Sequence, residues 1–316
     1  MRRLCTAGLL AGLCALTACS SSPGPAAGAH GTGSLGATTR ATTGSVPAAS
    51  APRTAPSASQ AAATAPAAPP TPRVTVTRTR TADGSLVTLA TFSGPVRYVL
   101  HNGSGDPGAA AAGLVRAGPA ITGAERSLLL AAFNGGFKLS AGAGGYEQEG
   151  HVISPLLRGL ASLVIDPSGQ ARIGIWGHGV PAPGEAVYSV RQNLAPLVLH
   201  GRPTAAAADW GLWGATLGGG EYVARSALGQ DAAGHLVYAA SMSASPADLA
   251  VAMSRAGVRI AMELDINPEW VQLDVARRPG GPLRTAIRGQ GRPANQFLLG
   301  WARDFIAVLA PAGAGG

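Results

Sequence analysis

Cysteine and lysine are almost missing from this chain of 316 residues. The three cysteines, Cys5, Cys14 and Cys19, all lie near the amino terminus, and Lys138 is the only lysine. Residues 20–316 therefore contain no disulfide, no thiolate metal site and no cysteine nucleophile. We expect packing alone to stabilise the folded part.

Acidic residues are absent from residues 1–72, and so are most large apolar side chains after residue 20. Residues 20–72 consist mainly of Ala, Ser, Thr, Pro and Gly. A segment of this composition cannot bury enough apolar surface to offset the entropy lost on ordering. The composition predicts a disordered tether over residues 19–72. Half of the formal net charge of +8 lies in residues 1–72, on Arg2, Arg3, Arg40 and Arg53.

A charged start followed by a short apolar run predicts a lipoprotein signal peptide over residues 1–18. The uncharged run Leu4–Ala18 is too short to span a membrane. Leu16-Thr17-Ala18-Cys19 resembles a bacterial lipobox, in which Cys19 carries the lipid, palmitate included. The resemblance implies a lipid anchor at the extracytoplasmic face of the cell membrane. An ordinary secretory signal, cleaved after a nearby small residue, is the alternative.

Residues 73–316 predict one β-rich domain of the mixed α/β (α+β) class, with a mixed sheet, β-hairpins and a few packed helices. Asp83-Gly84, Asp166–Gly169 and Asp231–Gly234 each separate two strand-like runs and predict hairpins. The length suffices for a substantial core. The arginines are scattered along the sequence and not interleaved with aromatics, so we expect no nucleic-acid partner. Further expected elements are a helix over Ala109–Ala117 and closing strands over Phe297–Trp301 and Phe305–Leu309.

A capped helix lies between two predicted strands near the carboxyl end. Ser245 is the expected N-cap, Pro246 fits the first helical position, Asp248 completes a capping box and Gly257 ends the helix. Strands over His235–Ser241 and Val258–Asn267 flank it. This order predicts a βαβ unit with the helix packed on the sheet.

Polar residues follow two apolar runs. Ser127–Phe133 predicts a buried strand that stops at Asn134-Gly-Gly-Phe-Lys138. The glycines permit positive φ and close backbone approach, and they leave backbone amides free to bind an anion. The alternative is that they are needed only for a turn. In Val258–Asn267 the period-two spacing predicts one strand face for Glu263, Asp265 and Asn267.

Glu263 and Asp265 form a candidate pair of acid and base. Their Cα atoms would be about 6.6 Å apart on a strand, and like charges held close push one pKa upward. This separation suits both retaining and inverting glycosidases. A structural pairing of a carboxylate with Arg225 or Arg259 is the alternative, and spacing alone favours it.

Cofactor chemistry has little support in the sequence. Asp265, Asn267 and Glu269 supply alternate oxygens, as calcium loops do, but the glycine and bidentate acid of an EF-hand are missing. A divalent cation there is a minority interpretation, and we otherwise expect no cofactor. No serine-hydrolase elbow or Walker loop is present, and the six histidines are dispersed.

Four segments together resemble the phosphodiester glycosidase family: Phe133-Asn-Gly-Gly-Phe137, Arg225-Ser-Ala-Leu-Gly229, Gln230-Asp-Ala-Ala-Gly-His235 and Ala261-Met-Glu-Leu-Asp265. The resemblance implies a mixed α/β domain that hydrolyses a sugar-1-phosphate diester at its glycosidic bond. It implies that Asn134, Gly135 and Gly136 line the site, Arg225 meets the phosphate and Asp265 is the central acid. The chain departs from the family at Ile266–Trp270, where glycines and a serine are usual.

The leading hypothesis is a surface-anchored glycoside hydrolase that cleaves a sugar-1-phosphodiester or a related cell-envelope glycan linkage. A non-catalytic envelope lipoprotein, which binds glycan or a protein partner through the same cleft, is the alternative. The expected partners are the glycan or sugar-phosphate substrate and the membrane through Cys19. In the hydrolase, Asp265 and Glu263 divide the acid and base or nucleophile work. The other expected contacts are Arg225 and Lys138 to phosphate, Asn134, Asn193 and Asn267 to hydroxyls, and Trp270 stacked on a sugar.

Overall fold

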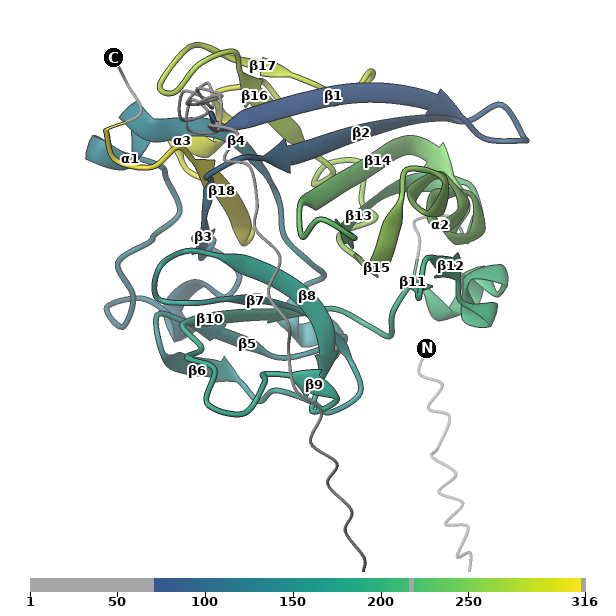
Figure 1. The fold of residues 1–316 in the computed structure, drawn as a ribbon, viewed down its shortest axis with the longest axis horizontal. Coiled ribbons are helices and arrows are strands. Elements are labelled where there is room, and N and C mark those ends of the chain that lie inside the picture. The colour runs from purple at the N-terminus through teal and green to yellow at the C-terminus, as the bar shows by residue number, and fades with distance from the viewer. Residues whose placement is uncertain (1–70, 216–218, 314–316) are drawn as a thin grey trace, which may run out of the picture. The chain divides into compact units, whose positions relative to one another are not determined.

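The computed structural model describes residues 71–215 and 219–313. The predicted signal peptide, Cys19 and all but the last two residues of the predicted tether lie outside the described residues. The described part is β-rich, with three sheets and few helices, as Figure 1 shows. The β-rich prediction is thus confirmed, although helices contribute less than an α+β class suggests.

The largest sheet has seven strands, and all its neighbouring strands are antiparallel. The predicted hairpins at Asp83-Gly84 and Asp231–Gly234 are both part of it. In spatial order the strands are β1 (Arg73–Arg80), β2 (Leu86–Ser93), β14 (Leu236–Ala244), β13 (Val223–Asp231), β15 (Val258–Glu263), β11 (Val198–Leu199) and β12 (Arg202–Pro203).

The other two sheets have five and six strands. Only the contact between the last two strands of the six-stranded sheet is parallel, so that sheet is mixed. The five-stranded order is β17 (Leu283–Thr285), β16 (Leu273–Ala276), β4 (Leu129–Asn134), β18 (Phe305–Leu309) and β3 (Arg97–His101). The six-stranded order is β6 (His151–Ser154), β5 (Tyr146–Gln148), β10 (Ser189–Gln192), β7 (Ala161–Ile165), β8 (Ala171–Trp176) and β9 (Gly179–Val180).

The described helices are short. No helix among residues 71–215 and 219–313 is long and apolar enough to cross a membrane. The α-helices are α1 (Gly123–Leu128), α2 (Pro246–Arg255) and α3 (Gln296–Leu299). The 3₁₀ helices are η1 (Gly108–Ala110), η2 (Leu139–Ala141), η3 (Ala205–Ala208) and η4 (Trp210–Leu212).

The predicted βαβ unit is present as β14, α2 and β15. β14 and β15 both pair antiparallel with β13, so they run parallel to each other with β13 between them. The predicted capping box is confirmed, because Ser245 Oγ accepts from the Asp248 amide at 3.1 Å and the Asp248 carboxylate accepts from the Ser245 amide at 3.4 Å. Leu249 and Met253 are fully buried against the sheet.

Three sequence predictions of secondary structure were wrong in part. The strand expected over Val258–Asn267 ends at Glu263, because the Asp265 amide leaves the sheet and bonds Gly135. The strand expected over Phe297–Trp301 is replaced by α3 and a bend, which place Phe297 and Trp301 against each other. A short apolar run fits either structure by pattern alone. Only the 3₁₀ turn η1 forms within the helix expected over Ala109–Ala117.

A shared core joins the three sheets. Phe92 of β2 stacks on Phe133 of β4 with ring centroids 5.5 Å apart, and Phe133 contacts Tyr238 of β14 at 5.0 Å. Leu163 of the six-stranded sheet belongs to the same buried cluster. This core fixes the ends of β4 and β15 side by side, and the candidate site lies there.

The capping box gives a test of the local fold. Replacing Ser245 with Ala removes the acceptor for the Asp248 amide, and we expect the free energy of unfolding to fall by about 1 kcal/mol. Urea denaturation measures it. Ser243→Ala is the matched control, since Ser243 is exposed just before the helix. Equal effects of the two substitutions would contradict a role for the cap.

Candidate active site

The two predicted strand ends meet through backbone contacts. The Asp265 amide donates to the Gly135 carbonyl at 3.2 Å, and the Gly135 amide donates to the Asp304 carbonyl at 2.9 Å. A Cβ at Gly135 would overlap the Asp304 carboxylate, and one at Gly136 would lie 2.9 Å from the Arg191 guanidinium carbon. Both glycines are therefore required for close approach, so the packing alone explains them.

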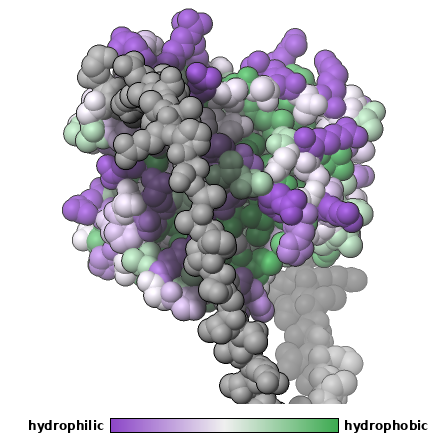
Figure 2. Space-filling model, viewed as in Figure 1, coloured by the Kyte–Doolittle hydropathy of each residue, from purple (hydrophilic) through white to green (hydrophobic). Residues whose placement is uncertain are grey.

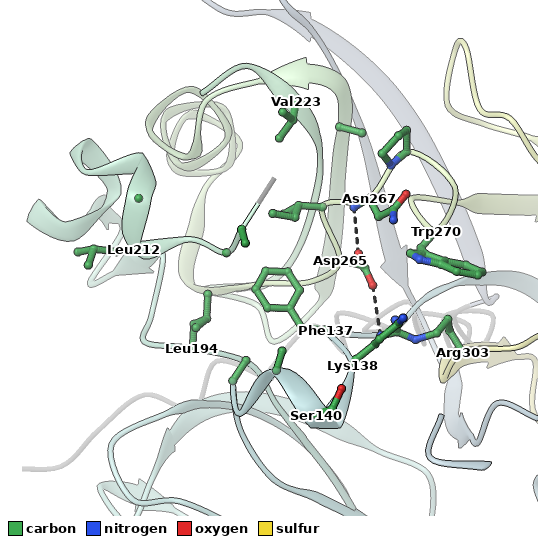
Figure 3. Close-up of a pocket in the computed structure, with 18 of the residues that line it drawn as sticks. Phe137, Lys138, Ser140, Leu194, Leu212, Val223, Asp265, Asn267, Trp270 and Arg303 are labelled. Carbon is green, nitrogen blue, oxygen red and sulfur yellow. Dashed lines mark hydrogen bonds and ion pairs between the residues drawn. The ribbon is translucent and has the colours of Figure 1, made fainter. Parts of the chain in front are cut away.

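A cavity of about 810 Å³ opens beside this junction (Figure 3). One side is apolar, and Asp265, Arg303 and Trp270 lie together on the other side of the view. The main apolar lining residues are Phe137, Leu194, Leu212, Ile266 and Trp270. The charged and polar lining side chains are Lys138, Ser140, Asp265, Asn267 and Arg303.

Among the described residues that line this cavity, Asp265 is the only one with a carboxylate. Its Oδ1 accepts from the Asn267 amide at 2.9 Å, and its Oδ2 lies 3.3 Å from Nη2 of Arg303. Burial raises the pKa of Asp265 to about 6, while the Arg303 cation and the Asn267 amide oppose that rise. The carboxyl group thus titrates close to neutral pH.

Arg303 is a site residue that the sequence analysis missed. Its side chain is 5% exposed, donates to the Gly136 carbonyl at 2.9 Å and lies 3.5 Å from the Asp106 carboxylate. Its guanidinium carbon is 5.7 Å from the centre of a Trp270 ring. The available signal was the charged pair Arg303-Asp304 between two apolar runs.

Asp304 anchors the same region from outside the cavity lining. Its carboxylate pairs with Arg191, with Nε–Oδ2 at 2.7 Å, and both side chains are 1% exposed. The Arg191 side chain also donates to the Phe137 and Gln192 carbonyls. This buried pair fixes the turn from Gly135 to Phe137, so it positions the cavity wall without contacting the cavity.

Lys138, Asn267 and Trp270, three of the predicted binding residues, line the cavity. The Lys138 side chain is exposed and makes no ion pair or hydrogen bond with any described residue. Asn267 Oδ1 accepts from the Glu269 amide at 2.9 Å. Trp270 packs edge-on against Trp301, with ring centroids 5.3 Å apart.

Glu263 and Arg225 lie behind the cavity wall. Both are fully buried, with Arg225 Nη1 2.8 Å from Glu263 Oε1, and neither is a lining residue. Arg225 also donates to the Ala244 and Trp213 carbonyls. Burial raises the pKa of Glu263 to about 8, and Arg225 opposes that rise. This contact is the structural pairing of a carboxylate with Arg225 that the sequence spacing favoured. The catalytic role predicted for Glu263 and the phosphate contact predicted for Arg225 stay predictions.

Asn134 and Asn193 are also buried and do not line the cavity. Asn134 Oδ1 accepts from the Tyr238 hydroxyl at 2.8 Å and from the Gln272 amide at 3.1 Å. Asn193 Oδ1 accepts from the Phe137 amide at 3.1 Å, while its Nδ2 donates to the Glu263 carbonyl at 2.9 Å. Their amide groups thus join the strand ends that surround the site.

The proposed cation ligands face arginines. Asp265 pairs with Arg303, and Glu269 Oε2 lies 2.6 Å from Nη2 of Arg292. Within residues 71–215 and 219–313, no group of three or more His, Cys, Asp or Glu side chains is arranged to hold a metal ion. The cation interpretation gains no support from these contacts.

Comparisons with known proteins give weak likenesses of fold. No family model matches the chain, and no curated protein matches its sequence. One similar structure is the catalytic domain of zebrafish N-acetylglucosamine-1-phosphodiester alpha-N-acetylglucosaminidase, auto-inhibited by its pro-peptide, at 13% identity and a TM-score of 0.46, covering 75% of this chain and 82% of that chain. Another is a hypothetical protein from Synechocystis, at 14% identity and a TM-score of 0.46, covering 76% of this chain and 62% of that one. Structural similarity at this level of identity and TM-score supports no conclusion about activity.

The buried pair behind the wall predicts a large loss of stability when one partner is removed. Arg225→Met leaves Glu263 buried without its cation, and we expect the free energy of unfolding to fall by about 3–5 kcal/mol. Urea denaturation at about pH 9, where Glu263 with its pKa of about 8 is ionised in the wild type, measures the change. Arg202→Met is the control, because Arg202 is exposed on an edge strand. A loss no larger than that of the control would show that the pair does not stabilise the fold.

Proposed function

We propose that the protein hydrolyses the glycosidic bond of a sugar-1-phosphodiester bound in this cavity, with ionised Asp265 at the reaction centre. One observation carries the proposal: a carboxyl group with a pKa raised to about 6 shares the cavity with Arg303 and Lys138. A titratable carboxyl beside two cations and an aromatic wall suits a substrate that joins a sugar to an anion.

The leaving group determines the role of Asp265. Breakage of the bond between C1 and the phosphate oxygen leaves the electron pair on a phosphate monoester, whose second pKa is about 6. This group leaves as a stable anion and needs no proton from an acid. Asp265 therefore acts in its ionised form, either as the base that takes a proton from the attacking water or as the nucleophile on C1.

The other lining side chains fit the two halves of such a substrate. The Arg303 guanidinium and the Lys138 ammonium suit the phosphate, because charge-assisted hydrogen bonds to phosphate oxygens are short and strong. Trp270 and Phe137 offer aromatic surface to the sugar, and the Asn267 amide is placed for a hydroxyl. Glu263 stays behind the wall as the partner of Arg225, so the proposal depends on Asp265.

The proposed location is the extracytoplasmic face of the cell membrane. It is supported by the lipobox-like segment that ends at Cys19 and by the acid-free tether composition of residues 19–72. A tether of this length would let the domain reach glycans of the cell envelope away from the membrane surface.

Substitution of Asp265 tests the chemistry. We expect Asp265→Asn to reduce the release of free sugar from a model sugar-1-phosphodiester by about a hundredfold or more, because the amide cannot act as base or nucleophile. Asp166→Asn is the control, since Asp166 lies in the turn between β7 and β8 and the amide keeps an acceptor for the turn. Equal turnover by wild type and Asp265→Asn, or binding without turnover, would overturn the proposal.

The pH dependence of the rate tests the protonation state. Because the ionised carboxylate is required, kcat/KM should rise with pH through a midpoint near the Asp265 pKa of about 6 and then level off. Arg303→Gln removes a cation that lowers this pKa, so the midpoint should move to higher pH. A rate that falls through the same pH range would assign Asp265 the role of an acid instead.

A further inference from the structure

Seven exposed arginines follow one edge of the molecule. Three belong to β1, and four belong to the segment from the end of β16 to residue 288. We call them the arginine seam: Arg73, Arg78, Arg80, Arg277, Arg278, Arg284 and Arg288. Figure 2 shows hydrophilic side chains along the upper edge, where Figure 1 places β1 and β17.

The charge of the arginine seam is not neutralised. None of its guanidinium groups forms an ion pair with a described residue. All 16 Asp and Glu residues of the chain lie within the described ranges, so no other part supplies a side-chain carboxylate. Arg78 and Arg80 instead donate to the Ala286 and Gly84 carbonyls, at 2.8 and 2.6 Å. Such a concentration of unpaired cations is a surface for an anion.

The arginine seam is hollowed and not flat. One recess of about 580 Å³ is lined by Arg73, Arg277, Arg278 and Arg284. A second recess of about 580 Å³ follows along β1 and is lined by Arg78, Arg80 and Arg288. Neither recess has an acidic lining residue. Along β1 the first and last arginines are about 23 Å apart, a distance that suits an extended ligand with repeated charges.

The chemistry of the lining selects among polyanions. No aromatic side chain lines either recess, whereas single-stranded nucleic acids are usually held by stacking on aromatic rings. The large exposed hydrophobic residues of the described chain all lie outside both recesses, and the aliphatic residues that line them, such as Val74 and Leu86, are partly or fully buried, so no large apolar side chain projects from the arginine seam to insert into a bilayer. The planar guanidinium fork matches phosphate oxygens in pairs.

We infer that the arginine seam binds a linear, phosphate-bearing polymer that carries no nucleobases. Its second recess also adjoins the candidate active site, because a Cβ at Gly289 would lie 3.6 Å from Met242 Cγ, and Met242 lines the cavity. Delivery of a phosphodiester-linked glycan from the seam to the cavity rests on the proposed function. Binding of the polymer does not, so the two are tested separately.

Inorganic polyphosphate is the test ligand, since it carries repeated phosphates without sugar or base. Titration calorimetry at low salt should show binding that weakens steeply as salt is added. The double variants Arg278→Gln with Arg284→Gln, and Arg80→Gln with Arg288→Gln, should each weaken binding by about tenfold or more. Arg202→Gln with Arg255→Gln removes the same charge from exposed positions elsewhere and should change affinity less than about twofold.

Three results would overturn the inference. They are the absence of polyphosphate binding, an equal loss in the control variant, and equally tight binding of single-stranded DNA or phosphatidylglycerol vesicles through the same arginines. Polyphosphate binding with no sugar release would refute the proposed hydrolysis and support the inference about the arginine seam. Sugar release without polyphosphate binding would refute the inference about the arginine seam and support the proposed hydrolysis.

Discussion

The hydrogen bond from the Asp265 amide to the Gly135 carbonyl is the constraint on which the site depends. It joins the end of β15 in the seven-stranded sheet to the end of β4 in the five-stranded sheet. Because the chain leaves β15 at this point, the Asp265 side chain turns toward the cavity while Glu263, two residues earlier, stays behind the wall with Arg225. The absence of a Cβ at Gly135 makes the approach possible.

Burial and charge then divide the acidic residues into separate roles. Asp304 and Glu263 are fully buried, each has an arginine of its own, and both hold backbone in place. Asp265 is partly open to the cavity and shares Arg303 with Asp106, so no cation is committed to it alone. A carboxyl group in that position keeps a pKa near neutrality and remains available to a ligand. Of the two acids that the sequence suggested as a pair, Asp265 lines the cavity and Glu263 does not.

Local patterns predicted much of the fold, and long-range contacts decided the rest. The sequence predicted two turns and a capping box correctly, because a few neighbouring residues determine each of them. These are the turns at Asp83-Gly84 and Asp231–Gly234 and the capping box at Ser245. Alternation beyond Glu263 failed, because the strand end is set by Gly135, more than a hundred residues away. Arg303 could not be assigned to the site for the same reason: its contacts with Asp106, Gly136 and Asp265 all come from distant parts of the chain.

The segment Ile266–Trp270 forms part of the cavity wall, and Trp270 packs on Arg303 and Trp301. The central claim is that Asp265 faces a site for the phosphate of a sugar. A carbon-13 NMR titration of the Asp265 carboxyl group tests it most directly, with and without a non-cleavable sugar-1-phosphonate. We predict a midpoint near the pKa of about 6 that moves upward when the phosphonate binds. A midpoint in the ordinary range of an exposed aspartate, unmoved by the phosphonate, would contradict it.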